Sequence, residues 1–292
     1  MRRRVLAAEA PWRRRIPTAL LPVVVGLRAL LARRNPLIWS AARLHMEFLL
    51  AKTRPEADLD EAAREYIRQM YWRAERRWRP ELITNQPVGG LERLLAAREP
   101  GRGLVLTFLH HANFDGAWAS LDRAGLHCHA VGASFLFEDD APEFLKQHLR
   151  LLEMGATMIS AGEGFAGIKA ALDAGSVVAI APDVVSRTPV RFVGRSVVGA
   201  AGAARLAVDT GSQVVVCTFH KDATAPARIE LGELLEPSDF ADVTSLLAEI
   251  LRQHEAAVLE WPEAYDRPMQ RWGHTSDEDK ARFGDSSELA PL

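Results

Sequence analysis

Cysteine is scarce in this chain of 292 residues, which contains only Cys128 and Cys217. Two cysteines cannot form a disulfide framework, and we expect two buried, reduced thiols unless the fold brings them together. Disorder is also excluded, because 48% of the residues are hydrophobic and 25% are charged. A chain of this length buries enough surface to fold without a structural metal or disulfide. The composition therefore indicates a globular protein with one large core or two smaller ones.

Acidic residues are almost absent from the first 34 residues, although the whole chain has a formal net charge of −2. This stretch contains nine arginines and a single acid, Glu9. Between the arginines, residues 16–27 are mostly apolar. This apolar run is too short to span a bilayer, which takes about 20 residues. The near-neutral sum therefore hides a strongly basic N-terminal segment.

Three interpretations of residues 1–34 are open. A secretory signal is disfavoured because Arg28 interrupts the apolar run, Pro17 and Pro22 disfavour a continuous helix, and no small-residue cleavage site follows. A surface anchor would place arginines on anionic headgroups and apolar side chains at the acyl boundary. The third interpretation is an ordinary helix that packs on the core. The anchor predicts a peripheral protein on the cytoplasmic face of the cell membrane, and the alternative is a cytoplasmic protein.

Helices dominate the pattern before residue 100. Residues 37–52 and 58–78 are predicted helices, and the second has apolar side chains at spacings of three and four. Asp58 or Asp60 would cap the second helix, and Pro80 would end it. A short helix is expected at 91–98, after which apolar strands alternate with amphipathic helices. The expected strands are 103–109, 129–134, 156–160, 177–182, 189–196, 213–219 and 226–232, and the expected helices are 114–124, 140–152, 163–174, 200–210 and 238–258.

This alternation predicts an α/β fold, with a mostly parallel central sheet flanked by helices behind an α-helical N-terminal section. The helical section would span residues 1–98 and include the basic, apolar segment 1–34. The α/β catalytic domain would span residues 99–274. Residues 275–292 are polar without periodicity, and we expect a loose tail there.

The chemistry-bearing residues follow the strand predicted at 103–109. This strand delivers His110 and His111 to its carboxyl end, the usual ligand-binding edge of an open α/β sheet. A strand-to-helix turn would let His110 fold back onto Asp115. A carboxylate that orients a neutral imidazole equips it to take a proton from a hydroxyl or amine. By itself the spacing also fits a histidine near a helix cap, with Asp115 balancing the helix dipole.

The block from His110 to Trp118 resembles the first motif, of the type His-x-Gly-Asn-Trp-Asp, of the late lipid A acyltransferases and the phosphatidylinositol mannoside acyltransferases. These families belong to the broader lysophospholipid and glycerol-phosphate acyltransferase superfamily. Blocks at 155–183, 190–219 and 261–272 resemble the family in the same order. The resemblance covers roughly residues 100–272 and implies a glycerol-phosphate acyltransferase-like fold.

The resemblance implies the transfer of an acyl chain from acyl-CoA or acyl carrier protein to a hydroxyl or amine of a lipid or glycolipid acceptor. It implies His110 as general base, Asp115 as its orienter and Asn113 as a residue that shapes the turn. The acyl thioester is a substrate, so no cofactor is expected, and acyl carrier protein would be a partner if it is the donor. No metal is expected, because no third ligand accompanies the histidines at a recognisable spacing. Nucleic acid is not expected, because no reading motif accompanies the N-terminal arginines.

Three further residues are candidates for substrate binding. Asp183 follows a predicted strand and would lie at the same sheet edge, either in the site or as a plain turn acid. Arg187 and Arg205 would bind phosphate groups of the donor or acceptor, since guanidinium groups match phosphate oxygens. The alternative for both arginines is a structural or solvated role. Backbone N–H groups at the start of helix 114–124 would stabilise the oxyanion.

The sequence departs from the family pattern in ways that bear on the acceptor. Ala112 replaces the glycine before Asn113, Val185 stands where a second acid is common, and an arginine expected after the second strand is missing. These losses suggest a smaller or less charged acceptor. The alternative functions are therefore an acyltransferase for a small soluble biosynthetic acceptor and a non-catalytic acyl- or lipid-binding protein of the same fold.

Overall fold

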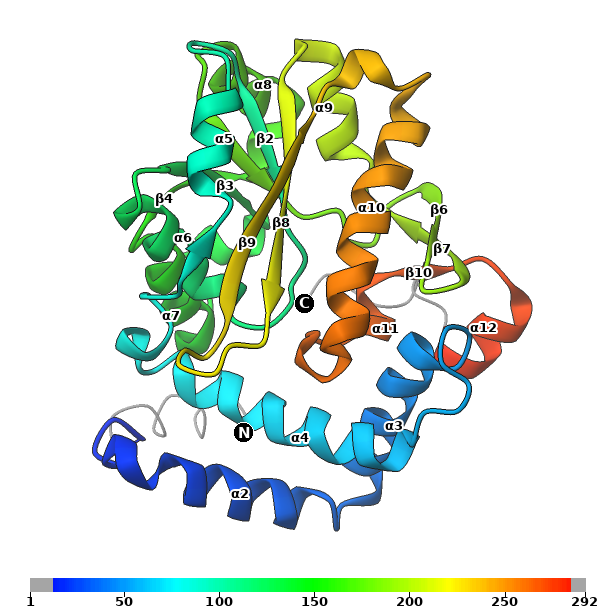
Figure 1. The fold of residues 1–292 in the computed structure, drawn as a ribbon. Helices are drawn as coiled ribbons and strands as arrows, with labels where there is room; N and C mark the ends of the chain where they lie inside the picture. The colour runs from blue at the N-terminus through cyan, green and yellow to red at the C-terminus, as the bar shows by residue number, and fades with distance from the viewer. Residues whose placement is uncertain (1–12, 285–292) are drawn as a thin grey trace.

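The N-terminal section consists of three helices whose ends follow local capping rules. The computed structural model describes residues 13–284, in which α2 (Leu21–Ala32), α3 (Pro36–Leu50) and α4 (Leu59–Arg76) lie along one side of the molecule (Figure 1). The Asn35 side chain caps α3, and Asp58 caps α4 by accepting from two backbone N–H groups. The helices predicted at 37–52 and 58–78 are thus confirmed.

Helix α2 has one buried and one exposed apolar face. Pro17 precedes it and Pro22 lies in its first turn, where a proline costs no hydrogen bond, so neither interrupts the helix. Its buried side chains pack on α4, while Val23 is 68% exposed. The buried carboxylate of Glu75 in α4 pairs with Arg28 of α2. Within residues 13–284 no helix is long and apolar enough to cross a membrane.

The central sheet has seven strands in the order β1-β9-β8-β2-β5-β3-β4, and all neighbouring pairs are parallel except β8 and β9. The middle strands β2 and β5 are buried along their whole length, as expected for apolar runs covered on both faces. The predicted α/β class with a mostly parallel sheet is confirmed. The strands are β1 (Val88–Gly89), β2 (Leu104–Thr107), β3 (Cys128–Gly132), β4 (Ala156–Ser160), β5 (Val177–Ile180), β8 (Gln213–His220) and β9 (Arg228–Leu235).

Helices cover both faces of this sheet (Figure 1). Along β2, Leu104 and Leu106 belong to one hydrophobic core with Trp118 of α6, whereas Val105 belongs to the other core with residues of α9 and α10. Cys128 and Cys217 are free and buried, as expected. The flanking helices are α5 (Leu91–Ala97), α6 (Phe114–Arg123), α7 (Glu143–Leu152), α8 (Gly164–Asp173), α9 (Gly202–Thr210) and α10 (Val243–Glu260).

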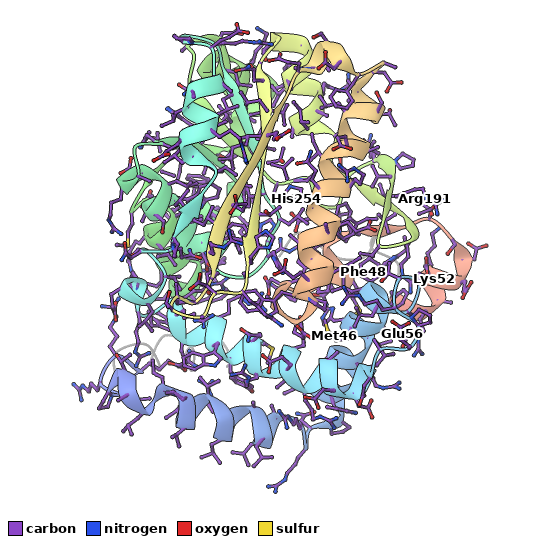
Figure 2. The ribbon with its side chains drawn as sticks, in the orientation of Figure 1. Met46, Phe48, Lys52, Glu56, Arg191 and His254 are labelled. Atoms are coloured by element: carbon purple, nitrogen blue, oxygen red, sulfur yellow. The ribbon has the colours of Figure 1, made fainter. Side chains whose placement is uncertain are left out.

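A second, three-stranded antiparallel sheet joins the C-terminal part to the helical section. It comprises β6 (Thr188–Phe192), β7 (Arg195–Gly199) and β10 (Gly273–His274), with α11 (Pro268–Arg271) just before β10. Phe48 of α3, labelled in Figure 2, lies edge-on to Phe283 with ring centroids 5.5 Å apart. The chain thus closes back on its own N-terminal helices.

The prediction of a loose tail over 275–292 is wrong for residues 275–284, which the structure describes. Asp277–Phe283 forms helix α12, capped by the side chain of Ser276. Asp279 of this helix pairs with the buried guanidinium of Arg195. Arg282 of the same helix pairs with Glu47 of α3. A cap and two long-range ion pairs thus order this segment, and none of them produces the apolar periodicity on which the prediction relied. Residues 285–292 lie outside the described part.

Candidate active site

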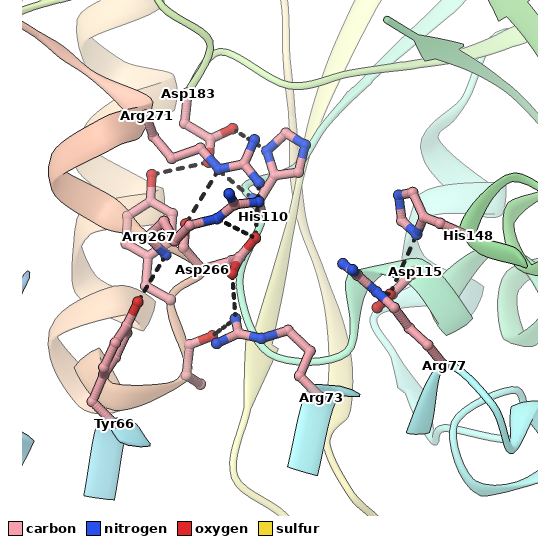
Figure 3. A network of polar contacts seen from close by, with 12 residues as sticks. Tyr66, Arg73, Arg77, His110, Asp115, His148, Asp183, Asp266, Arg267 and Arg271 are labelled. Carbon is pink, nitrogen blue, oxygen red and sulfur yellow. Dashed lines mark hydrogen bonds and ion pairs between the residues drawn. The ribbon is translucent and has the colours of Figure 1, made fainter. Parts of the chain in front are cut away.

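Two neighbouring parallel strands bring His110 and Asp183 together. Strands β2 and β5 pair in register, with Thr107 opposite Ile180. His110 and Asp183 each lie three residues beyond these partners, so the two side chains emerge side by side at the carboxyl edge. Nδ1 of His110 lies 2.9 Å from Oδ1 of Asp183, and the backbone N–H of His110 donates to Oδ2 at 3.0 Å (Figure 3).

Burial and charge set the protonation of this pair. Burial lowers the pKa of His110, the charge of Arg271 lowers it further, and Asp183 only partly opposes this effect. Burial would raise the pKa of Asp183, but His110 and Arg271 lower it below its ordinary value. At neutral pH the imidazole is therefore neutral, with Nδ1–H donated to the carboxylate. Nε2 has no hydrogen-bond partner within the described chain, and the side chain is 18% exposed.

Residues near the C-terminus hold this pair in place. The Tyr265 hydroxyl donates to Oδ2 of Asp183 at 3.0 Å, and it accepts from the indole N–H of Trp272 at 3.1 Å. Burial raises the pKa of Tyr265 well above its ordinary value, so the phenol stays protonated. Asp183 thus receives three hydrogen bonds that fix its carboxylate. The sequence signal for these partners is the block 261–272, which had no assigned role.

His111 has a structural position. It is buried, and its Nε2 lies 2.8 Å from the carbonyl oxygen of Trp261. Burial lowers its pKa to about 4, so the ring is neutral and donates to that carbonyl. The backbone of His111 also bridges that of Tyr265. His111 therefore anchors the C-terminal segment to the turn that carries His110.

The turn after His111 depends on an unusual backbone conformation. Ala112 has a φ of 51°, in the left-handed region that favours glycine. This conformation explains why a glycine belongs at this position in the family pattern. The next residue, Asn113, accepts a hydrogen bond on Oδ1 from Arg76 at 3.0 Å, and its carbonyl accepts one from Gln86. Asn113, which we expect to shape the turn, is thus held in place by Arg76 and Gln86.

The contact predicted between His110 and Asp115 is not formed, because Asp183 occupies the place beside His110. Asp115 is buried in the first turn of α6, 3.0 Å from Nε of Arg77 and 3.6 Å from Nδ1 of His148. Burial would raise its pKa, but His148 and Arg77 hold it well below the usual range. The left-handed turn at Ala112 separates the directions of the two side chains. No sequence pattern singled out Arg77 or His148.

The predicted phosphate-binding arginines lie on the surface. Arg187 is exposed four residues after Asp183, and Arg205 is exposed on α9. Neither side chain has a hydrogen bond or ion pair with another residue in 13–284. The arginine whose charge acts on His110 is instead Arg271. Over the same described range, no group of three or more His, Cys, Asp or Glu side chains could hold a metal ion.

Residues 38–273 match the family described as bacterial lipid A biosynthesis acyltransferase. No curated protein matches. Among solved structures, the chain is similar to the crystal structure of the 1-acyl-sn-glycerophosphate (LPA) acyltransferase PlsC from Thermotoga maritima, with 14% identity and a TM-score of 0.42. This similarity covers 84% of the present chain and 97% of the other.

Proposed function

Because the chain belongs to the family of bacterial lipid A biosynthesis acyltransferases and is therefore an acyltransferase, we propose that His110 is its general base. The substrates are an acyl thioester and a hydroxyl or amine of a lipid or glycolipid acceptor. The observation that carries this proposal is the neutral imidazole of His110, oriented by Asp183, with a free Nε2 at the carboxyl edge of the sheet.

The proposed reaction needs no covalent enzyme intermediate. Nε2 of His110 takes the proton of the acceptor hydroxyl or amine as that group attacks the thioester carbonyl carbon. The Asp183 carboxylate stabilises the imidazolium that forms. When the tetrahedral intermediate collapses, the carbon–sulfur bond breaks, and the proton on Nε2 goes to the leaving thiolate. General-base catalysis of this kind contributes roughly 10²- to 10⁴-fold in rate, and backbone N–H groups near the start of α6 are the proposed oxyanion donors.

In this mechanism Asp115 is a positioning residue. Its ion pair with Arg77 and its close contact with the imidazole of His148, whose pKa burial lowers, tie the start of α6 to the end of α4 and to α7. The same helix α4 holds Asn113 through Arg76. Asp115 would therefore support the turn that carries His110, rather than orient the imidazole directly.

Exposed apolar side chains near the sheet edge support a lipid acceptor over a small soluble one. Large apolar side chains follow the carboxyl ends of three strands that flank the site, and they are more than a third exposed. They are Phe137 after β3, Phe165 after β4, and Val184 and Val185 after β5. Monomeric proteins rarely gather exposed apolar groups without a ligand or interface to cover them. An acyl chain or a lipid acceptor would cover these.

The exposed face of α2 supports peripheral binding to the cytoplasmic surface of the membrane. Five large apolar side chains lie on this face, and Leu37 at the start of α3, which is 79% exposed, adds a sixth. Exposed arginines flank them at both ends of the helix. Apolar groups beside cations suit an anionic lipid surface. The apolar side chains on α2 and just before it are Leu20, Val23, Leu27, Leu30 and Leu31, and the arginines are Arg14, Arg15 and Arg34.

Substitution of His110 tests the catalytic proposal. We expect His110→Asn to reduce acyl transfer at least 10²-fold, measured by mass spectrometry with acyl-CoA and acyl carrier protein donors and with lipid and soluble acceptors. His129→Asn is the matched control, because His129 is the second residue of β3 and so lies near the amino ends of the strands, away from the carboxyl edge that carries His110. Full turnover by His110→Asn would exclude His110 as the base. A wild type that binds acyl chains without turning over any pair would indicate a binding protein.

A further inference from the structure

Three arginines surround one carboxylate next to the proposed base. Oδ2 of Asp266 lies 3.1 Å from Nη2 of Arg271 and 3.8 Å from Nε of Arg267, and Oδ1 lies 3.6 Å from Nη1 of Arg73 (Figure 3). These arginines hold the pKa of Asp266 well below its usual range in spite of burial, so the carboxylate is ionised. The group thus carries three positive charges and one negative charge.

The group is attached to the turn that carries the base. The backbone N–H of Asp266 donates to the carbonyl oxygen of His110 at 2.9 Å. The charge of Arg271 acts on both His110 and Asp183. An anionic ligand bound to these arginines would therefore lie close to His110 and Asp183.

The arginines keep unused hydrogen-bond donors. Arg271 gives Nε and Nη2 to Asp266, and its Nη1 has no partner in the described residues. Arg267 has no hydrogen bond from its guanidinium there, and 45% of its side chain is exposed. The side chain of Arg73 is only 8% exposed, and its buried Nη2 has no hydrogen-bond partner among residues 13–284. The cluster therefore offers both charge and N–H groups that the protein itself does not satisfy.

The backbone of Arg267 is held in a conformation that arginine rarely adopts. Its φ of 50° lies in the left-handed region, and its N–H donates to the Tyr66 hydroxyl of α4 at 3.2 Å. Such conformations concentrate at ligand-binding and active sites. Here the conformation places the guanidinium beside Asp266 and next to that of Arg271.

We propose that Arg267 and Arg271 form a phosphate-binding site beside His110. Partly buried cations need counter-charges, and guanidinium forks match phosphate oxygens. The phosphate would belong either to the acyl donor or to the headgroup of the acceptor, and this assignment of the carrier rests on the proposed function. The site differs from the surface arginines that the sequence suggested for phosphate.

Binding of inorganic phosphate to the full chain tests the site without any need for turnover. By calorimetry at constant ionic strength, we expect Arg267→Gln combined with Arg271→Gln to weaken phosphate binding at least tenfold. Arg191→Gln is the matched control, because Arg191 is an exposed arginine of β6 without a hydrogen bond or ion pair in residues 13–284 (Figure 2). We expect it to bind like the wild type. Arg271→Lys keeps the positive charge but lacks the forked guanidinium. Its affinity for phosphate should lie between those of the wild type and the double variant.

Equal binding by the wild type and the double variant would overturn the proposal, and so would a wild type that binds no phosphate. Near-ultraviolet circular dichroism shows whether each variant is folded, and the exposed Arg267→Gln alone provides a milder test. Competition against bound phosphate identifies the carrier. Stronger competition by 4′-phosphopantetheine assigns the site to the donor, and stronger competition by glycerol 3-phosphate assigns it to the acceptor. Full turnover by His110→Asn would refute the catalytic proposal but would not change the binding of phosphate. The two proposals can therefore fail separately.

Discussion

Replacement of Asp183 by asparagine separates the contact seen in the structure from the one suggested by sequence spacing. Asparagine keeps the size of the side chain but removes its charge, so the imidazolium formed during transfer loses its stabilising partner. The asparagine amide can also donate to Nδ1 of His110, which moves the imidazole proton to Nε2 and blocks the base. We expect acyl transfer to fall about 10³- to 10⁴-fold, equivalent to about 4 to 5.5 kcal/mol of transition-state stabilisation.

Asp115→Asn should behave differently. Asp115 pairs with Arg77 and His148, so its loss removes a buried counter-charge rather than the partner of the base. Breaking a buried pair costs about 3 to 5 kcal/mol. We expect about 3 kcal/mol in the free energy of unfolding, because a quarter of the Arg77 side chain is exposed and water can reach it. The folded fraction should lose much less of its transfer rate than Asp183→Asn does, because Asp115 acts on His110 only through the turn.

Three measurements check this comparison: steady-state transfer, near-ultraviolet circular dichroism and urea unfolding of both variants. The pH profile adds a fourth. In the wild type, kcat/KM should stay level as the pH passes the ordinary histidine pKa of 6.5 and fall only at lower pH, because the pKa of His110 in the folded protein lies below that value. Asp183 raises this pKa, so its removal should move the acid limb of any residual activity to lower pH. A folded Asp183→Asn with near-normal transfer, beside an inactive folded Asp115→Asn, would refute the reasoning and favour Asp115 as the orienter.

Two further predictions concern the membrane face and acid stability. Val23→Glu with Leu27→Glu should reduce binding to anionic vesicles at least tenfold in co-sedimentation, since both side chains are exposed on α2, while Leu95→Glu, on the exposed surface of α5, should bind normally. Equal binding by both variants would exclude α2 as the membrane contact. His111 and His254 are buried with pKa values lowered to about 4 and about 3. Because the unfolded chain takes up these protons first, stability should be full above pH 6.5 and fall as the pH drops below it, by about 2 kcal/mol for each histidine at pH 5. Urea unfolding at pH 7.5 and pH 5 measures this loss, and equal stability at the two values would contradict it.

Local signals predicted the fold well. Apolar runs and alternation located six of the seven strands of the central sheet but missed β1, which is only two residues long. Asp58 marked the start of α4 because capping depends on adjacent residues. The helix α12 was missed, although Ser276 is a local cap, because the ion pairs that order it join Asp279 to Arg195 and Arg282 to Glu47, far away in the sequence. Short-range patterns cannot show a partner 84 positions away.

The site was predicted less completely, for the same reason. His110 and Asp183 were both expected at the carboxyl edge of the sheet. The pairing between them depends on the register of β2 against β5, which no spacing within one segment reveals. Asp115 was predicted to orient His110 because it is near His110 in the sequence. The arginines of α4 gave no signal, because a charged residue on an amphipathic helix is ordinarily solvated.

Helix α4 has a consequence for how this protein can be divided. Arg73, Arg76 and Arg77 reach from it to Ala264, Asn113 and Asp115, so one helix of the N-terminal section supplies counter-charges and hydrogen bonds to the proposed site. A fragment that begins at residue 99 would keep His110 and Asp183 but would leave the carboxylate of Asp115 without its guanidinium partner. The change of sequence pattern near residue 98 is thus a poor place to cut the chain. The smallest unit that preserves the surroundings of His110 includes α4.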